Sequence, residues 1–153
     1  MSRPKPHALS EYRHSRVLAT RWMDNDAYGH MNNVVYYSFF DTLVNAWLIE
    51  HGALDVEKGD VVGFVVETGC HYFAPLAYPE PVTAAIRVAH VGRSSVRYEL
   101  ALFASASATA AAQGHFVHVY VDREGRRPVR ELPAALQKAL RPLLVASPPK
   151  EET

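Results

Sequence analysis

The sequence predicts an α+β fold in which one long apolar helix is wrapped by an antiparallel sheet of about five strands. Residues 33–52 are apolar over most of a helical circumference, and their polar side chains are confined to one narrow stripe. Several later segments alternate apolar and polar residues with the period of two that is typical of strands with one buried face. The four residues GRSS at 92–95 are short enough to link two such strands as a hairpin, which makes that pair antiparallel.

The helix at 33–52 follows a first strand at 15–23, where the sequence SRVLATRWM is rich in β-forming residues. Asn32 or Asn33 can cap the start of the helix, and Gly52 can end it. A helix with so little polar surface must be buried by the elements that surround it.

The remaining strands lie C-terminal to this helix. VVGFVVETGCHYFAPL at 61–76 is expected to be a long strand that is bent near Gly69. The period-two pattern predicts further strands at 82–89, 96–102 and 117–122. A short helix is expected to begin near Pro133, because proline is favourable in a first turn, and to stop before Pro142.

Length and composition restrict the class of protein. The 153 residues are enough for one domain with its own core, and we expect a flexible arm at 1–11, a single domain at 12–145 and a disordered tail at 146–153. Sixteen basic residues balance sixteen acidic ones, which argues against nucleic acid as a partner. The chain has one cysteine, no segment like a signal peptide and no stretch of about 18 apolar residues, so we expect a cytoplasmic protein without a membrane span.

A polar cluster, DNDAYGHMNN at 24–33, lies directly before the predicted helix. A carboxylate in such a turn can activate water or attack a carbonyl carbon, and the free amides of the first helical turn can stabilise the developing negative charge. Asp26 is the candidate carboxylate, although aspartate is also common as an ordinary turn residue. Asp24 is expected to bond the turn backbone or to pair with Arg21. Gly29 is expected to allow a backbone angle or a close approach that a side chain would block.

The stretch RWMDNDAYGHMNNVVYYSFFD resembles the opening motif of the hotdog-fold acyl-CoA thioesterases of the 4-hydroxybenzoyl-CoA thioesterase type. HYFAPLAYPEPV, GRSS and HVYVD follow in the order of that family, and the resemblance covers roughly residues 15 to 140. It implies a hotdog domain at 12–145, Asp26 as the catalytic carboxylate and the backbone amide of Asn33 as the group that polarises the thioester carbonyl. The departure lies in the middle of the D-x-D and in AYGHMNN, which replaces a more apolar sequence and bears on acyl specificity.

Other residues are candidates for binding the substrate. Tyr36, near the helix start, is our first choice for the acyl pocket. His30 is expected to pack beneath the turn and fix its shape, but it lies four residues after Asp26 and could instead act as a base. Arg93, with its neighbours, could bind a coenzyme A phosphate or belong to a solvated hairpin. The full set is Tyr28, Gly29, His30, Asn32 and Tyr36 for the substrate, and Arg93, Ser94 and Ser95 for coenzyme A.

Metal chemistry is not expected, because the spacing of His71, His90, His115 and His118 resembles no ligand set, and these histidines fit surface or satisfied core positions. Cys70 has no activating pattern around it, and a serine-hydrolase GxSxG motif is absent from the sequence. No cofactor is expected either, since coenzyme A would be part of the substrate.

The resemblance therefore implies hydrolysis of an acyl-CoA thioester to the free acid and coenzyme A. Two alternatives remain open: a hotdog enoyl-thioester hydratase that uses Asp26 and His30 together, and an acyl-thioester binding protein without catalysis. The resemblance also implies a homodimer or homotetramer with the active site at the subunit interface, where a partner's strand at 61–64 would line the site. Unpaired sheet edges, which proteins usually cover, agree with this expectation.

Overall fold

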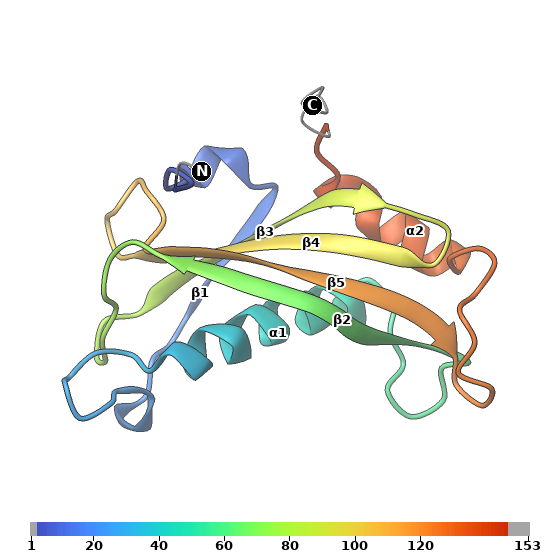
Figure 1. Ribbon diagram of the computed structural model, residues 1–153, viewed down its shortest axis with the longest axis horizontal. Coiled ribbons are helices and arrows are strands. Elements are labelled where there is room, and N and C mark those ends of the chain that lie inside the picture. Colours follow the sequence, from blue (N-terminus) through green and yellow to red (C-terminus); the bar gives the residue numbers. More distant parts are fainter. Residues whose placement is uncertain (1–2, 147–153) are drawn as a thin grey trace.

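The computed structural model describes residues 3–146, in which one antiparallel sheet of five strands carries a helix on one face (Figure 1). The strand order is β1-β3-β4-β5-β2, so β1 and β2 form the two edges. This arrangement agrees with the predicted hotdog topology, and the central helix has 18 residues. The elements are β1 (His14–Leu18), α1 (Asn33–Glu50), β2 (Val61–Tyr72), β3 (Val82–Val91), β4 (Ser95–Ala104), β5 (Ala112–Asp122) and α2 (Ala134–Leu140).

Several details of the strands differ from the prediction. β5 begins at Ala112 rather than at residue 117, and β2 ends at Tyr72 rather than at residue 76. β1 ends at Leu18 rather than at residue 23, because Trp22–Asp24 forms a 3-10 turn that Asp24 closes on the backbone N–H of Arg21. The register of β2 against β5 shifts between Val65 and Glu67, so the irregularity lies before Gly69. Gly69 is instead a place of close approach, since a Cβ there would lie 2.9 Å from Cε1 of His115.

The helix α1 buries one face rather than its whole circumference. Its N-cap is Asn32, whose side chain accepts the N–H of Val34 at 3.1 Å. Trp47 donates from Nε1 to the carbonyl of Ala139 at 2.9 Å and so ties α2 to α1. Val34 and Ile49 remain exposed on the outer side, which corrects the expectation of a fully wrapped helix. The buried side chains recur at spacings of three and four: Tyr36, Phe39, Phe40, Leu43, Val44, Trp47 and Leu48.

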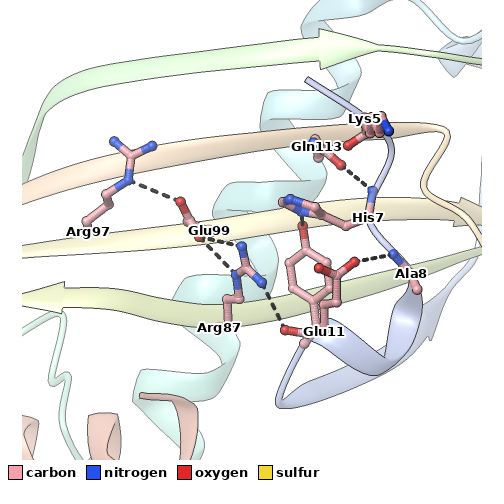
Figure 2. A network of polar contacts seen from close by, with 9 residues as sticks. Lys5, His7, Ala8, Glu11, Arg87, Arg97, Glu99 and Gln113 are labelled. Atoms are coloured by element: carbon pink, nitrogen blue, oxygen red, sulfur yellow. Dashed lines mark hydrogen bonds and ion pairs between the residues drawn. The ribbon is translucent and has the colours of Figure 1, made fainter. Parts of the chain in front are cut away.

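The opposite face of the sheet is crossed by the segment before β1 (Figure 2). The backbone N–H of His7 donates to Oε1 of Gln113 at 2.8 Å, and Nε2 of Gln113 donates to the carbonyl of Lys5 at 3.1 Å. Arg87 joins the carbonyl of Glu11 to the carboxylate of Glu99. The predicted arm is therefore hydrogen-bonded to the sheet over these residues. A small apolar cluster fills the space beneath it: Tyr12, Ala85, Ala101, Phe103 and Ala110.

The predicted tail at 146–153 lies outside the described residues, apart from Ala146. Between residues 3 and 146, neither helix combines the length and the hydrophobicity that a bilayer-spanning helix needs.

Candidate functional site

The polar cluster forms a compact loop at the start of α1. The backbone N–H of Asp26 donates to the carbonyl of His30 at 2.8 Å, and the N–H of Gly29 donates back to the carbonyl of Asp26 at 3.1 Å. Gly29 has φ +78°, the left-handed region that glycine enters without strain, as predicted. The N–H of Met31 donates to the carbonyl of Leu76 at 2.7 Å and fixes the loop to the segment that follows β2.

The two carboxylates of the D-x-D lie in different surroundings. Asp24 is fully buried and accepts three N–H groups of Arg21, from the backbone at 2.8 Å and from Nε and Nη2 at 3.1 and 2.9 Å. This is the pairing that the sequence predicted. Asp26 is half-buried, and its Oδ1 accepts the backbone N–H of Tyr28 at 2.8 Å and that of His30 at 3.4 Å. Its Oδ2 has no hydrogen-bond partner within residues 3–146.

The start of α1 presents a free donor. The side chain of Asn32 accepts the N–H of Val34, and its backbone carbonyl accepts the N–H of Val35 at 2.9 Å. The backbone N–H of Asn33, the first residue of the helix, has no acceptor in the described part of the chain. Because first-turn amides carry the positive end of the helix dipole, this N–H is suited to bind an oxygen that gains negative charge.

A cavity of about 330 Å³ opens beside this amide. Its second wall consists of the end of β2 and the residues that follow, and Tyr36 and Tyr72 meet there edge to face with ring centroids 4.9 Å apart. Of the predicted site residues, His30, Asn33 and Tyr36 line the cavity, whereas Asp26, Tyr28, Gly29 and Asn32 shape the loop next to it. The complete lining is His30, Met31, Asn33, Tyr36, Tyr72, Phe73, Ala74 and Pro75.

The sequence led us to expect His30 beneath the turn, and this expectation is wrong. Its side chain is exposed at the cavity, and its backbone rather than its ring holds the loop, through the bonds to Asp26. No hydrogen bond joins the side chains of His30 and Asp26 in the described structure, so the acid–base pair that a hydratase would use is not assembled in the protomer.

Arg93, Ser94 and Ser95 lie at the far end of the sheet from this cavity. Arg93 and Ser94 belong to the turn between β3 and β4, and Ser95 is the first residue of β4. The carbonyl of Ser94 accepts the N–H of Tyr120 at 2.7 Å. A ten-residue strand such as β3 spans about 33 Å. The loop at 24–33 contacts Leu76, in the segment before the first residue of β3, whereas Arg93 follows the last residue of β3. Figure 1 shows the two regions at opposite ends of the molecule. One protomer therefore does not bring the predicted coenzyme A residues to the cavity.

Two parts of the structure were not predicted from the sequence. The first is the wall formed by residues 72–75, whose approach to Asn33 is shown by the bond from Oη of Tyr72 to the carbonyl of Asn33 at 3.4 Å. The second is His118, which is buried without a partner for Nε2 instead of being satisfied or exposed. Burial raises the pKa of Cys70 to about 11, in keeping with an unreactive thiol. No group of three potential metal ligands occurs among residues 3–146.

Residues 20–140 match the Thioesterase-like superfamily. The chain belongs to this superfamily. Among solved structures, the PA5185 protein from Pseudomonas aeruginosa PAO1 is similar, with 50% sequence identity and a TM-score of 0.89, over 95% of this chain and 100% of that one. None of the curated proteins matches the chain.

Two further solved structures share this fold and have a known activity or bound ligand. A thioesterase from Thermus thermophilus, solved with coenzyme A and zinc, is 27% identical with a TM-score of 0.67, over 86% of this chain and 94% of that one. A 1,4-dihydroxy-2-naphthoyl-CoA thioesterase from Synechocystis is 17% identical with a TM-score of 0.74, over 82% of this chain and 93% of that one. The latter similarity establishes the shared fold.

Proposed function

We propose that the protein hydrolyses an acyl-CoA thioester to the free acid and coenzyme A. The observation that carries this proposal is the backbone N–H of Asn33, which lies in the wall of a cavity and has no acceptor among residues 3–146. The loop beside this cavity holds Asp26, whose Oδ2 also has no partner among these residues. Superfamily membership supports thioester hydrolysis, and the coenzyme A in the Thermus thermophilus structure supports coenzyme A as the thiol.

In this mechanism the thioester carbonyl oxygen accepts the N–H of Asn33. Asp26 either removes a proton from water, which attacks the carbonyl carbon, or attacks that carbon itself and is released by water afterwards. The C–S bond breaks, and the electron pair leaves on the sulfur of coenzyme A, which then takes up a proton. The N–H of Asn33 stabilises the oxyanion that forms between attack and cleavage, a contribution of about 10² to 10³ in rate for one donor.

The test is thiol release from acyl-CoA esters by wild-type protein and by Asp26→Asn. The amide keeps an oxygen for the N–H of Tyr28 but removes the anion, so kcat should fall by about 10² or more while KM changes little. His30→Ala should cost about tenfold, since its backbone bonds to the loop remain. Equal losses in both variants, together with loss of enoyl absorbance without thiol release, would favour the hydratase. Full activity of folded Asp26→Asn would disprove the mechanism.

The active unit in this proposal is a homodimer formed through the β2 edge. Phe64, Val65 and Val66 are exposed on this edge strand, with 61% of Val66 accessible, and an apolar edge favours pairing with another strand. Val66→Lys should give a folded monomer in light scattering with strongly reduced thiol release. A wild-type protein that is monomeric and fully active would contradict the dimer.

Coenzyme A is bound loosely at the surface in this scheme, by Arg93, Ser94 and Ser95 of the partner subunit. In an antiparallel two-fold pairing the far end of one sheet approaches the cavity end of the other. Arg93→Ala should raise KM several-fold and leave kcat nearly unchanged, because a distant phosphate contact is equal in the ground and transition states. An unchanged KM would remove Arg93 from the site.

A further inference from the structure

The N-terminal strap, residues 3–9, extends along the face of the sheet opposite α1 as far as the wall of the cavity beside Asn33. Nη2 of Arg3 donates to the carbonyl of Tyr72. The guanidinium of Arg3 also lies over the ring of Phe73, with its Cζ 5.1 Å from the ring centroid. Tyr72 and Phe73 both line the cavity, whereas Arg3 does not. The strap therefore contacts the cavity wall from outside the thioester site.

The strap is also hydrogen-bonded to the loop between β4 and β5, residues 105–111. The N–H of Leu9 donates to the carbonyl of Ala108 at 3.3 Å. The N–H of Ala110 donates in the other direction, to the carbonyl of His7 at 2.9 Å. Strap and loop thus form a short antiparallel bridge, so a displacement of one would displace the other.

The last residue of this loop holds the cavity wall. The carbonyl of Ala111 accepts the N–H of Phe73 at 2.7 Å and that of Ala74 at 3.1 Å. The N–H of Ala111 donates in turn to the carbonyl of Leu102 at 2.8 Å. Because β2 ends at Tyr72, Phe73 and Ala74 lie beyond the strand and are held through this one carbonyl. The strap and the wall are therefore attached to neighbouring residues of the same loop.

Gln113 of β5 fastens the middle of the strap (Figure 2). Its side chain is buried, accepts the N–H of His7 at 2.8 Å and donates to the carbonyl of Lys5 at 3.1 Å. Both bonds are made to the strap backbone, so they do not need the side chain of Lys5. Gln113 is paired with His71 of β2, one residue before Tyr72. The strap is thus fastened beside the end of the strand from which the wall continues.

Burial of the apolar cluster on this face of the sheet does not explain the first residues of the strap. The N-terminal segment contributes Tyr12 to that cluster, and Arg3 lies nine residues before Tyr12. Arg3 is exposed, so its contacts add little to the overall stability. They can still select one position of the wall, because β2 is an edge strand of the protomer and the end of such a strand opens locally at low cost.

We propose that the docked strap holds the cavity wall at 72–75 in the position that catalysis requires, with Arg3 and Gln113 as positioning residues. This inference rests on the proposed hydrolysis and adds a control of the thioester site from the opposite face of the sheet. Neither residue contacts the substrate in this scheme, since both act through the wall.

The wall is important because it faces the donor on α1. Oη of Tyr72 donates to the carbonyl of Asn33 at 3.4 Å, and its ring meets that of Tyr36 edge to face. A distance of 3.4 Å is long for a bond from a hydroxyl, so this contact does not fix the wall by itself. Release of the strap should let the wall shift relative to the N–H of Asn33. A misplacement of about 1 Å can cost about 10² in rate.

The test measures thiol release from acyl-CoA esters by full-length variants. Gln113→Met keeps the length of the side chain and removes both bonds to the strap, so kcat should fall about tenfold while KM changes at most about twofold. Arg3→Ala should lower kcat about threefold, and Arg3→Lys, which keeps a cation and a donor, should restore most of this loss. Lys5→Ala is the matched control. It removes a charge from the strap but keeps the carbonyl that Gln113 binds, and both kinetic values should stay unchanged.

Hydrogen exchange shows whether the wall is released. The amides of Phe73 and Ala74 should exchange about tenfold faster in Gln113→Met and about threefold faster in Arg3→Ala, but at the wild-type rate in Lys5→Ala. The amides of β3 and β4 should be unaffected, which separates release of the wall from a general loss of stability. Arg3→Ala keeps the test decisive if Gln113→Met does not fold, because replacement of an exposed side chain costs little stability.

Three results would overturn the role of the strap. Wild-type kcat in folded Gln113→Met and Arg3→Ala would show that the wall is positioned without it. Equal changes in Arg3→Ala and Lys5→Ala that are confined to KM and disappear at high salt would mean that the segment only attracts the phosphates of coenzyme A. Wild-type exchange at Phe73 and Ala74 in every variant would show that the strap and the wall are not coupled.

Failure of this inference is distinguishable from failure of the proposed function. Absence of thiol release from every ester by the wild-type protein would overturn the proposed hydrolysis. The exchange rates of Phe73 and Ala74 need no substrate, so they would still test whether the strap holds the wall.

Discussion

Replacement of Asp24 by asparagine should destabilise the protein and leave catalysis almost intact, the reverse of the result expected for Asp26. Asp24 is 0% exposed and accepts three N–H groups of Arg21, at 2.8, 3.1 and 2.9 Å. An asparagine keeps one accepting oxygen but turns an amide N–H₂ toward groups that can only donate. At least one N–H of Arg21 therefore loses its acceptor, and where this is the backbone N–H the 3-10 turn at Trp22–Asp24 loses its closure.

The loss of stability in Asp24→Asn depends on how exposed the N–H groups of Arg21 are to water. A hydrogen bond to a charged group contributes about 1.5 to 3 kcal/mol, but the side chain of Arg21 is 59% exposed, so its two bonds to Asp24 exchange readily with water. The bond from the backbone N–H is sheltered and carries most of the cost. We therefore expect the free energy of unfolding to fall by about 2 kcal/mol.

Urea denaturation measures this change, with the slope m unchanged if the native and unfolded states keep their compactness. Glu124→Gln, the same carboxylate-to-amide change in an exposed turn, is the control and should shift stability by less than about 0.5 kcal/mol. Thiol release by the folded Asp24→Asn protein should stay within about threefold of wild type. A loss of kcat of about 10² at unchanged stability would show that the roles of the two aspartates had been interchanged.

Three further predictions concern stability. Gly29→Ala should cost about 1 kcal/mol in urea denaturation, because φ is +78° but nothing lies within 4 Å of the added Cβ; a stabilised variant would contradict this. Trp47→Phe should lower the free energy of unfolding by about 1 kcal/mol, because it removes the bond to the carbonyl of Ala139. The amide hydrogens of α2 should then exchange faster. A change in helix packing alone would not confine this faster exchange to α2. Burial lowers the pKa of His7 and of His118, so below about pH 6.5 these two histidines bind more protons in the unfolded state than in the folded state. The free energy of unfolding should therefore fall as the pH drops below about 6.5, and a shallower slope is expected for His118→Gln.

The sequence predicted those parts of the fold that depend on neighbouring residues. The period of two in β3, β4 and β5 and the spacing of three and four in α1 are local patterns, and the Asn32 cap and the Asp24–Arg21 pair join residues at most three positions apart. The end of β1 was misplaced because the capping preference of Asp24 outweighs the strand preference of the residues before it.

The parts that the sequence did not reveal depend on distant contacts. The bonds of the N-terminal segment to Gln113 cross more than a hundred positions, and the contact of Tyr72 with Asn33 crosses 39. The missing partner of His118 is likewise invisible in an alternating strand, because a satisfied core histidine has the same pattern. The sequence therefore located the polar loop before α1, which carries the proposed catalytic residues, but not the wall opposite it.

The unsatisfied features of the protomer gather along one edge of its sheet. The N–H of Asn33 and the cavity beside it adjoin the Tyr72 end of β2, and a second cavity, which His118 lines, adjoins the Val62 end of the same strand. Between them β2 exposes Phe64, Val65 and Val66 on an edge that has no neighbouring strand. A two-fold axis through this stretch would cover the apolar edge and at the same time bring each free amide close to the other chain. Dimerisation and catalysis are thus expected to depend on the same strand, which is why Val66→Lys should prevent dimerisation and strongly reduce thiol release while the fold is retained.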